Sequence, residues 1–287
     1  MRAAKGWNDY ELIDASSGNR LERWGEYILV RPDPQVIWNT EKKDSRWHNA
    51  DAVYHRSSSG GGSWEFRHRL PDEWQVAWNG LRLYVTPTNF KHTGVFPEQA
   101  ANWTLYQELI RSCGREIRVL NLFGYTGAAT LACMKAGAFV CHVDASKGMV
   151  SQAKRNSVLN GMADVPCRWI VDDCMKFVLR EARRGNRYDA VIMDPPSYGR
   201  GPSGEIWKFE DNIEELVLAC KDILSDDPLF FAINSYTTGI SPSAPGYLLS
   251  CAMRGYPGEV ITDEIGLPVS ETGFVLPCGN TSIYIKR

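Results

Sequence analysis

Short apolar runs alternate with longer segments of helical spacing from residue 100 onward. The first runs, such as residues 117–122, 139–143 and 190–193, are almost continuously apolar, which is typical of parallel strands covered on both faces. We therefore predict an α/β fold with a Rossmann-like, doubly wound sheet of seven strands joined by right-handed crossovers. The expected strands are 117–122, 139–143, 168–171, 190–193, 229–234, 274–276 and 281–285, with the last two as an antiparallel hairpin. The expected helices are 100–111, 128–136, 147–160, 174–184 and 212–224.

The first 90 residues follow a different pattern. They contain most of the ten tryptophans, and short apolar runs alternate with turn-forming residues. Residues 26–32, 64–70, 74–80 and 81–87 have the composition of strands. We predict a small β-rich domain at residues 1–90, a candidate RNA- or substrate-binding region, and a cofactor-binding domain at residues 91–287.

The amino-acid composition limits the classes of molecule that the protein is expected to bind. The formal net charge is −2, so no global field attracts nucleic acid, and any RNA contact needs a local basic patch. Such patches occur at residues 41–48, 64–69 and 183–187, where a simple solvated face is the alternative. We expect no membrane span, no secretory signal, a cytoplasmic location and no metal site, since the eight cysteines form no CxxC pair.

Candidate binding residues follow the predicted strands. The segment NLFGYTG, residues 121–127, has Gly124 and Gly127 where a strand turns into a helix. Asp144 follows the second strand, where it can accept hydrogen bonds from ribose hydroxyls, and Asp172 or Asp173 follows the third, where it can hold an adenine amine. A dinucleotide site needs an earlier glycine, so the sequence favours S-adenosylmethionine (SAM), which has no pyrophosphate.

The segment DPPSYG, residues 194–199, follows the fourth strand. Two prolines fix the backbone of this loop, which presents Asp194 and the carbonyls of Pro195 and Pro196 toward the same edge of the sheet. Tyr198 can stack on a planar base. Because methyl transfer from a sulfonium needs in-line alignment above all, this loop is the predicted catalytic element.

Together, these motifs resemble those of the RlmI/RlmK-like class I rRNA methyltransferases. The resemblance covers residues 80–287, in segments that include FKHTGVFPEQAANW, VDASKGMVSQAKRN and LPCGNTSIYIKR. It implies a SAM-binding domain beside a small β domain, with large-subunit 23S rRNA as partner. Many members carry an N-terminal PUA domain, and no such pattern is evident here. The implied cofactor-binding residues are Lys91, Thr93, Gln99, Phe123, Gly124, Tyr125, Thr126, Gly127, Asp144, Ala145, Ser146, Asn156, Asp172 and Asp173.

The methylated atom depends on the segment after the fifth strand. Family members that methylate cytosine C5 use a cysteine there, because a thiolate must first add to the base. This chain has Asn234-Ser235-Tyr236 instead, and Cys174 is interpreted as a packing residue. We therefore expect transfer to nitrogen, with Asn234 beside Asp194 in the catalytic set.

Other functions stay open at this point. The acceptor can instead be a protein or a small molecule, and the fold can also serve as a catalytically degenerate binding scaffold. A nicotinamide oxidoreductase is a remoter alternative. The oligomeric state, monomer or homodimer, is left undecided.

Overall fold

The computed structural model describes residues 1–57, 61–88, 91–200, 204 and 206–287, with the side chain of Arg200 left out. The chain forms two compact units. The first comprises Met1–Ala101 and Ile265–Cys278, and the second comprises Asn102–Glu264 and Gly279–Arg287. Residues 265–278 thus belong to the same unit as the N-terminal residues, and the sequence-based division at residue 90 stays a prediction.

The first unit is rich in β structure. Five strands form a sheet in the order β2-β3-β4-β5-β6, and β7 and β8 form a separate two-stranded sheet. A two-residue strand, β1, pairs in parallel with Ile265 and Gly266. The strands are β1 (Arg2–Ala3), β2 (Tyr10–Ser16), β3 (Asn19–Trp24), β4 (Tyr27–Pro32), β5 (Ala52–Arg56), β6 (Gly62–Phe66), β7 (Trp74–Trp78) and β8 (Leu81–Val85), with short 3-10 helices η1 (Ser45–Trp47) and η2 (Pro97–Gln99).

Buried charges explain why β2 and β3 were not predicted. Glu22 of β3 is fully buried, yet its carboxylate accepts hydrogen bonds from Arg31 Nε at 2.6 Å and from the Tyr10 hydroxyl at 2.8 Å. Asp14 of β2 is also buried and accepts a hydrogen bond from Trp47 Nε1 at 2.8 Å. Pairing makes these charges tolerable in the interior, but in the sequence they interrupt the apolar alternation that identifies a strand.

The second unit has the predicted doubly wound sheet. Strands β9, β10, β11, β12 and β15 run parallel, and β17 is antiparallel to β15. The order is β16-β17-β15-β12-β9-β10-β11. The elements are α1 (Ala100–Ser112), β9 (Arg118–Leu122), α2 (Ala128–Lys135), β10 (Phe139–Asp144), α3 (Lys147–Leu159), β11 (Cys167–Val171), α4 (Cys174–Arg183), β12 (Ala190–Met193), β13 (Tyr198–Arg200), β14 (Ile206–Lys208), α5 (Phe209–Lys221), β15 (Phe230–Ser235), α6 (Ser243–Ala252), β16 (Gly258–Pro268) and β17 (Val275–Lys286).

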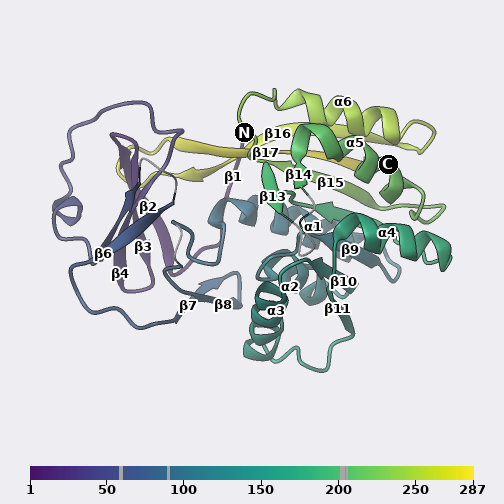
Figure 1. The fold of residues 1–287 in the computed structure, drawn as a ribbon, viewed down its shortest axis with the longest axis horizontal. Coiled ribbons are helices and arrows are strands. Elements are labelled where there is room, and N and C mark those ends of the chain that lie inside the picture. Colours follow the sequence, from purple (N-terminus) through teal and green to yellow (C-terminus); the bar gives the residue numbers. More distant parts are fainter. Residues whose placement is uncertain (58–60, 89–90, 201–203, 205) are drawn as a thin grey trace. The chain divides into compact units, whose positions relative to one another are not determined.

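Helices cover both faces of this sheet (Figure 1). Phe230 of β15 stacks on Tyr106 of α1, with ring centroids 5.1 Å apart. Its neighbour Phe231 points to the opposite face, into a buried cluster with residues of α4, α5 and α6. The alternation along a single strand thus divides the hydrophobic core into two layers. No helix among the described residues is long and apolar enough to cross a membrane.

The predicted hairpin at the C-terminal end was wrong. Residues 275–276 and 281–285 are not in two strands of a hairpin but in one strand, β17, which begins one residue after the predicted start at 274. Its Pro-Cys-Gly-Asn sequence has the composition of a turn, yet Gly279 serves packing, because a Cβ there would lie 2.7 Å from the ring of Tyr236. Strand β16 and helix α6 were not predicted, and α5 begins at Phe209 rather than at residue 212.

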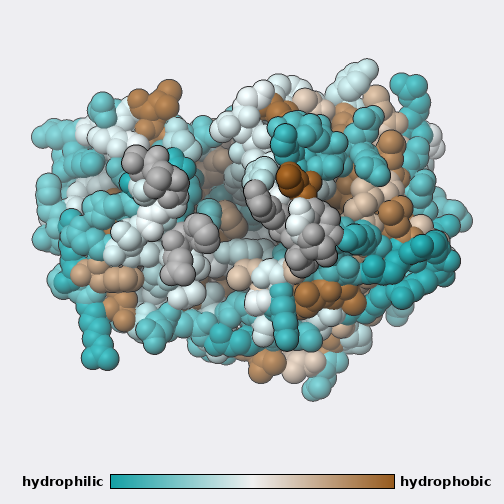
Figure 2. Space-filling model, in the orientation of Figure 1, coloured by the Kyte–Doolittle hydropathy of each residue, from teal (hydrophilic) through white to brown (hydrophobic). Residues whose placement is uncertain are grey.

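On the face of the molecule drawn in Figure 2, hydrophobic residues are interspersed among hydrophilic ones. Isolated exposed apolar side chains are normal on protein surfaces. Among them are Ile206 of β14, which is 56% exposed, and Tyr198 of β13, which is 52% exposed.

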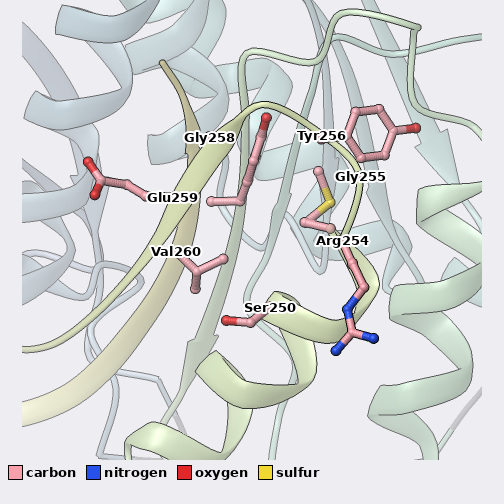
Figure 3. A pocket seen from close by; sticks show the side chains of 9 residues that line it. Ser250, Arg254, Gly255, Tyr256, Gly258, Glu259 and Val260 are labelled. Carbon is pink, nitrogen blue, oxygen red and sulfur yellow. The ribbon is translucent and has the colours of Figure 1, made fainter.

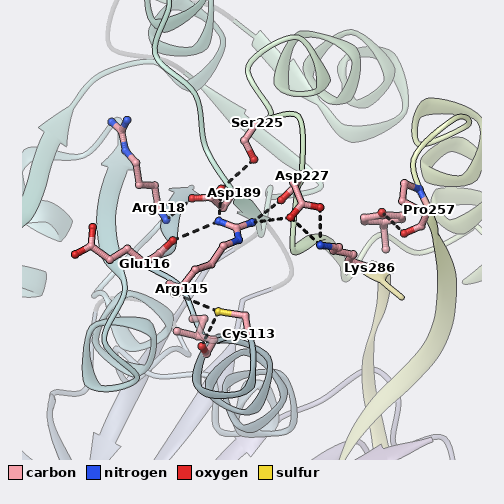
Figure 4. A network of polar contacts seen from close by, with 11 residues as sticks. Cys113, Arg115, Glu116, Arg118, Asp189, Ser225, Asp227, Pro257 and Lys286 are labelled. Carbon is pink, nitrogen blue, oxygen red and sulfur yellow. Dashed lines mark hydrogen bonds and ion pairs between the residues drawn. The ribbon is translucent and has the colours of Figure 1, made fainter.

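A polar network joins the amino ends of the central strands (Figure 4). Asp189, just before β12, accepts hydrogen bonds from the backbone N–H of Arg118 at 2.9 Å, Arg115 Nη1 at 2.7 Å and Ser225 Oγ at 2.9 Å. Arg115 also donates to the carbonyl oxygen of Asp227. One nearly buried carboxylate therefore fixes three segments at the edge of the sheet opposite the carboxyl ends of its parallel strands.

We expect Asp189→Ala to destabilise the second unit, because it removes the acceptor that three donors share. The free energy of unfolding should fall by about 2–4 kcal/mol, since each unsatisfied buried group costs about 1–3 kcal/mol. Urea denaturation followed by circular dichroism measures the change. Asp226→Ala, at an exposed position nearby, is the control, and equal midpoints for the two variants would contradict this role of the network.

Candidate functional site

The candidate site lies at the carboxyl end of β9. Leu122 pairs with Val143 of β10 on one side and with Met193 of β12 on the other. The chain winds away from β9 in opposite directions, so this position is the switch point at which doubly wound sheets bind ligands. It brings together the loops that follow the three strands, namely residues 123–127, 144–146 and 194–197. We refer to residues 123–127 as the cofactor loop and to residues 194–197 as the reactive loop.

The cofactor loop has a strained backbone. Phe123 and Tyr125 have φ angles of +54° and +50°, in the left-handed region that costs a residue with a Cβ about 1–2 kcal/mol. Such strain concentrates at functional sites, where the surrounding structure enforces it. Gly127, with φ at +87°, precedes the first turn of α2, so the free N–H groups of that helix face the loop and can bind an anion.

The two glycines of the loop are also required by the protein's own packing. A Cβ at Gly124 would lie 2.4 Å from Cε1 of His142, and one at Gly127 would lie 2.8 Å from the Cβ of Ala153. His142 is buried, which lowers its pKa to about 4, so its ring is neutral at physiological pH. The two glycines therefore meet a packing constraint behind the loop, in addition to any close approach of a ligand in front of it.

Asp144 connects the cofactor loop to the end of β10. Its two carboxylate oxygens accept hydrogen bonds from the backbone N–H groups of Tyr125 at 2.9 Å and Ser146 at 2.8 Å. Burial raises the pKa of the Asp144 carboxyl, although both hydrogen bonds act in the opposite direction. Each oxygen keeps a further lone pair for a ligand. From behind, buried Asn156 donates to the Thr126 carbonyl oxygen at 2.9 Å.

The remaining cofactor candidates of this unit lie next to Asp144. Ala145 and Ser146 are exposed. The backbone N–H of Asp172 donates to the Asp144 carbonyl oxygen at 3.1 Å, which brings the end of β11 to the same place. Asp172 forms an ion pair with Arg180, and Asp173 caps α4 by accepting a hydrogen bond from the backbone N–H of Lys176. Both carboxylates thus have partners within the protein, and their contact with adenine stays a prediction.

The reactive loop is held at several points. The backbone N–H of Asp194 approaches the Leu122 carbonyl oxygen at 3.5 Å. Ser197 Oγ lies 2.9 Å from Thr237 Oγ1, and the Ser197 carbonyl oxygen accepts a hydrogen bond from the backbone N–H of Phe209 at 3.0 Å. Pro195 is buried, whereas Pro196 is exposed, so the loop is anchored at its start and presented to solvent beyond it.

Trp207 is a residue that the sequence did not identify. Its Nε1 donates to the Pro196 carbonyl oxygen at 2.7 Å, and its ring lies 5.1 Å from that of Phe123. It lies in β14, which forms a two-stranded hairpin with β13. Only this pairing, which places Trp207 opposite Gly199, could have singled it out.

Asn234 has a partner set of its own. Its Oδ1 accepts hydrogen bonds from Asn102 Nδ2 at 3.0 Å and Thr281 Oγ1 at 2.7 Å, and all three side chains are buried. This network joins α1, β15 and β17. The structure therefore gives the Asn234 oxygen a structural role, and contact with a substrate stays a prediction.

Three further candidates lie in the first unit. Lys91 donates to the Pro32 carbonyl oxygen at 3.3 Å, and burial lowers its pKa. Thr93 and Gln99 are buried, the latter in η2. Their part in a cofactor pocket stays a prediction.

A shallow pocket of about 210 Å³ lies elsewhere in the second unit (Figure 3). Its walls come from the end of α6, the start of β16 and Tyr284, and they include Arg254, Tyr256 and Glu259. None of the site residues predicted from the sequence is among its lining residues, so this pocket and the switch point of the sheet are different places.

Comparisons with known proteins agree with this geometry. A model of the family described as S-adenosylmethionine-dependent methyltransferase matches residues 48–226. The crystal structure of the SAM-dependent methyltransferase from Agrobacterium tumefaciens is similar, with a TM-score of 0.94 and 38% sequence identity over 99% of this chain and 93% of that chain.

Two curated relatives are rRNA methyltransferases. Ribosomal RNA large subunit methyltransferase I of Aeromonas salmonicida is 28% identical over 54% of this chain and 36% of its own length. Ribosomal RNA large subunit methyltransferase K/L of Magnetococcus marinus is 33% identical over 72% of this chain and 26% of its own length. The chain thus spans about a third or less of these relatives. The expected resemblance, fold class and cofactor are confirmed at the level of the family: the chain belongs to the S-adenosylmethionine-dependent methyltransferases.

Proposed function

We propose that this protein transfers a methyl group from SAM to a base of RNA, in large-subunit rRNA, and at a nitrogen atom rather than at cytosine C5. The observation that carries the proposal is the junction at the carboxyl end of β9. There the cofactor loop and the reactive loop extend from adjacent strands, as Leu122 and Met193 pair directly.

The residues around Asp144 fit SAM. The free lone pairs of its carboxylate suit the two ribose hydroxyls, and the N-terminus of α2 suits the carboxylate of the methionine moiety. Asp172 and Asp173 lie next to this position, where they can bind the adenine. Phe123 occupies the place where a pyrophosphate would need a glycine, which disfavours NAD. When bound, SAM supplies an electrophilic methyl group on a sulfonium.

The reactive loop fits a planar acceptor. Tyr198 is half exposed and lies opposite Lys208 across the β13–β14 hairpin, so both side chains are on the same face. An aromatic ring can stack on a base and a lysine can contact a phosphate. The Asp194 carboxylate and the Pro195 carbonyl oxygen can accept hydrogen bonds from an amine. They would thereby orient the nitrogen lone pair, and Asp194 can take the proton that the nitrogen loses.

The choice of nitrogen rests on the lack of a poised thiolate. Cys174 forms a hydrogen bond with the backbone of Phe123, in the cofactor loop. It is buried, however, and burial raises the pKa of its thiol well above the ordinary value. A neutral thiol is a poor nucleophile. The curated relatives are named as large-subunit rRNA methyltransferases, which supports rRNA as the acceptor and with it a cytoplasmic location.

The role of Asp144 can be tested by titration calorimetry with SAM. Asp144→Asn should raise the Kd by roughly 10- to 100-fold, since a hydrogen bond to a charged group contributes about 1.5–3 kcal/mol. Asp164→Asn, at an exposed position of the same unit, should leave the Kd unchanged. Similar Kd values for the two variants would remove Asp144 from the site.

The pH dependence of SAM binding gives a second test of Asp144. In the wild type, affinity should fall as the pH decreases from 7 toward the Asp144 pKa, which burial raises above 3.8. The reason is that protonation converts an acceptor oxygen into a donor. The decrease should be absent in Asp144→Asn. A wild-type affinity that is constant over this range would mean that no ligand group depends on the carboxylate.

The acceptor atom can be identified by mass spectrometry of nucleosides from large-subunit rRNA. We expect rRNA from cells that lack this protein to gain one N-methylated nucleoside after incubation with the protein and SAM. Cys174→Ala should retain this activity. Formation of 5-methylcytosine together with an inactive Cys174→Ala would overturn the nitrogen assignment, and methylation of a protein or metabolite instead of RNA would overturn the acceptor.

A further inference from the structure

The β13–β14 hairpin has two functionally different faces. Tyr198 and Lys208 are directly opposite each other, and Gly199 and Trp207 form the next pair. Because neighbouring residues of a strand point to opposite sides, Trp207 lies on the side away from Tyr198. Gly199 is close to the reactive loop, since a Cβ there would lie 3.4 Å from Pro196 Cγ. The hairpin therefore presents Tyr198 outward while Trp207 lies against the loop.

Trp207 fixes the direction of a carbonyl group in the reactive loop. The indole N–H donates to the Pro196 carbonyl oxygen at 2.7 Å. The ring of Pro196 already fixes its φ angle, so the hydrogen bond removes the remaining freedom, which is rotation about ψ. With the loop also held at Ser197 by Phe209, the peptide groups between Asp194 and Tyr198 have one preferred orientation.

The same side chain contacts the cofactor loop. The rings of Trp207 and Phe123 are 5.1 Å apart with an interplanar angle of 56°, and both pack against the buried cluster of this unit. Among the residues that the structure describes, Phe123 and Tyr125 are the two aromatic ones with a left-handed backbone. A ligand that fixes the conformation of Phe123 therefore also fixes the position of the Trp207 ring.

We propose that Trp207 is a positioning residue for methyl transfer. It holds the reactive loop in its productive orientation and connects that orientation to occupancy of the cofactor loop. The effect of Trp207 on catalysis rests on the proposed function. The connection that Trp207 makes between the two loops does not. Trp207→Phe is the informative variant, because it keeps an aromatic ring beside Phe123 and removes the N–H that binds Pro196.

Two measurements test the catalytic effect. Trp207→Phe should bind SAM with a Kd within about twofold of the wild type, whereas the rate of methyl transfer to deproteinised large-subunit rRNA at saturating SAM should fall by roughly 10- to 100-fold, the scale expected for a small misplacement of reacting groups. Trp38→Phe is the matched control, since Trp38 Nε1 also donates to a carbonyl oxygen, that of Ala15 at 2.8 Å. A wild-type rate in Trp207→Phe would overturn the proposal.

Hydrogen exchange tests the connection without any acceptor. Addition of SAM should slow exchange of the backbone amides of Asp194 and of residues 197–199 in the wild type and in Trp38→Phe, and this protection should be lost in Trp207→Phe. A purely structural role would speed exchange equally with and without SAM. If the wild type methylates no RNA, the proposed function fails, and the exchange result still decides the role of Trp207: protection that persists in Trp207→Phe overturns it.

Discussion

The central position of β9 is the constraint on which the candidate site depends. Hydrogen bonds to β10 on one side and β12 on the other fix the register of three strand ends at Leu122, Val143 and Met193. Because parallel strands present their carboxyl ends at one edge, the Asp144 carboxylate and the proline-rich loop that begins at Asp194 lie at the same edge although they are 50 residues apart in sequence. The loops supply the functional groups, and the sheet determines where these loops lie.

Stability and strain are distributed to opposite edges of the sheet. At the amino ends, Asp189 satisfies three donors and ties neighbouring segments together. At the carboxyl ends, Phe123 and Tyr125 have unfavourable backbone angles, which the hydrogen bonds to Asp144 and the packing behind the loop maintain. The net stability of a domain is only about 5–15 kcal/mol. Backbone strain at one edge of the sheet therefore has to be offset by fully formed hydrogen bonds elsewhere, as at the opposite edge.

Much of the second unit could be predicted from the sequence, because buried parallel strands are recognisable as continuous apolar runs. The positions of Asp144 and Asp194 followed from counting along those runs. Features that depend on pairing between distant residues could not be predicted. Strand β17 contains Pro277 and Gly279, which suggested a turn, and β2 and β3 contain charges whose partners lie on other strands. Trp207 is of the same kind, since its hydrogen bond to Pro196 becomes visible only when the hairpin is formed.

The return of residues 265–278 to the first unit has a consequence for biosynthesis. Val269 pairs with Leu12, and the backbone N–H groups of Ser270 and Glu271 donate to the Leu12 and Ile13 carbonyl oxygens. A chain that grows from its N-terminus therefore cannot complete its first unit until almost all of the second has been synthesised. We infer that the edge of β2 stays open on the ribosome, and that the unit begun first is finished last.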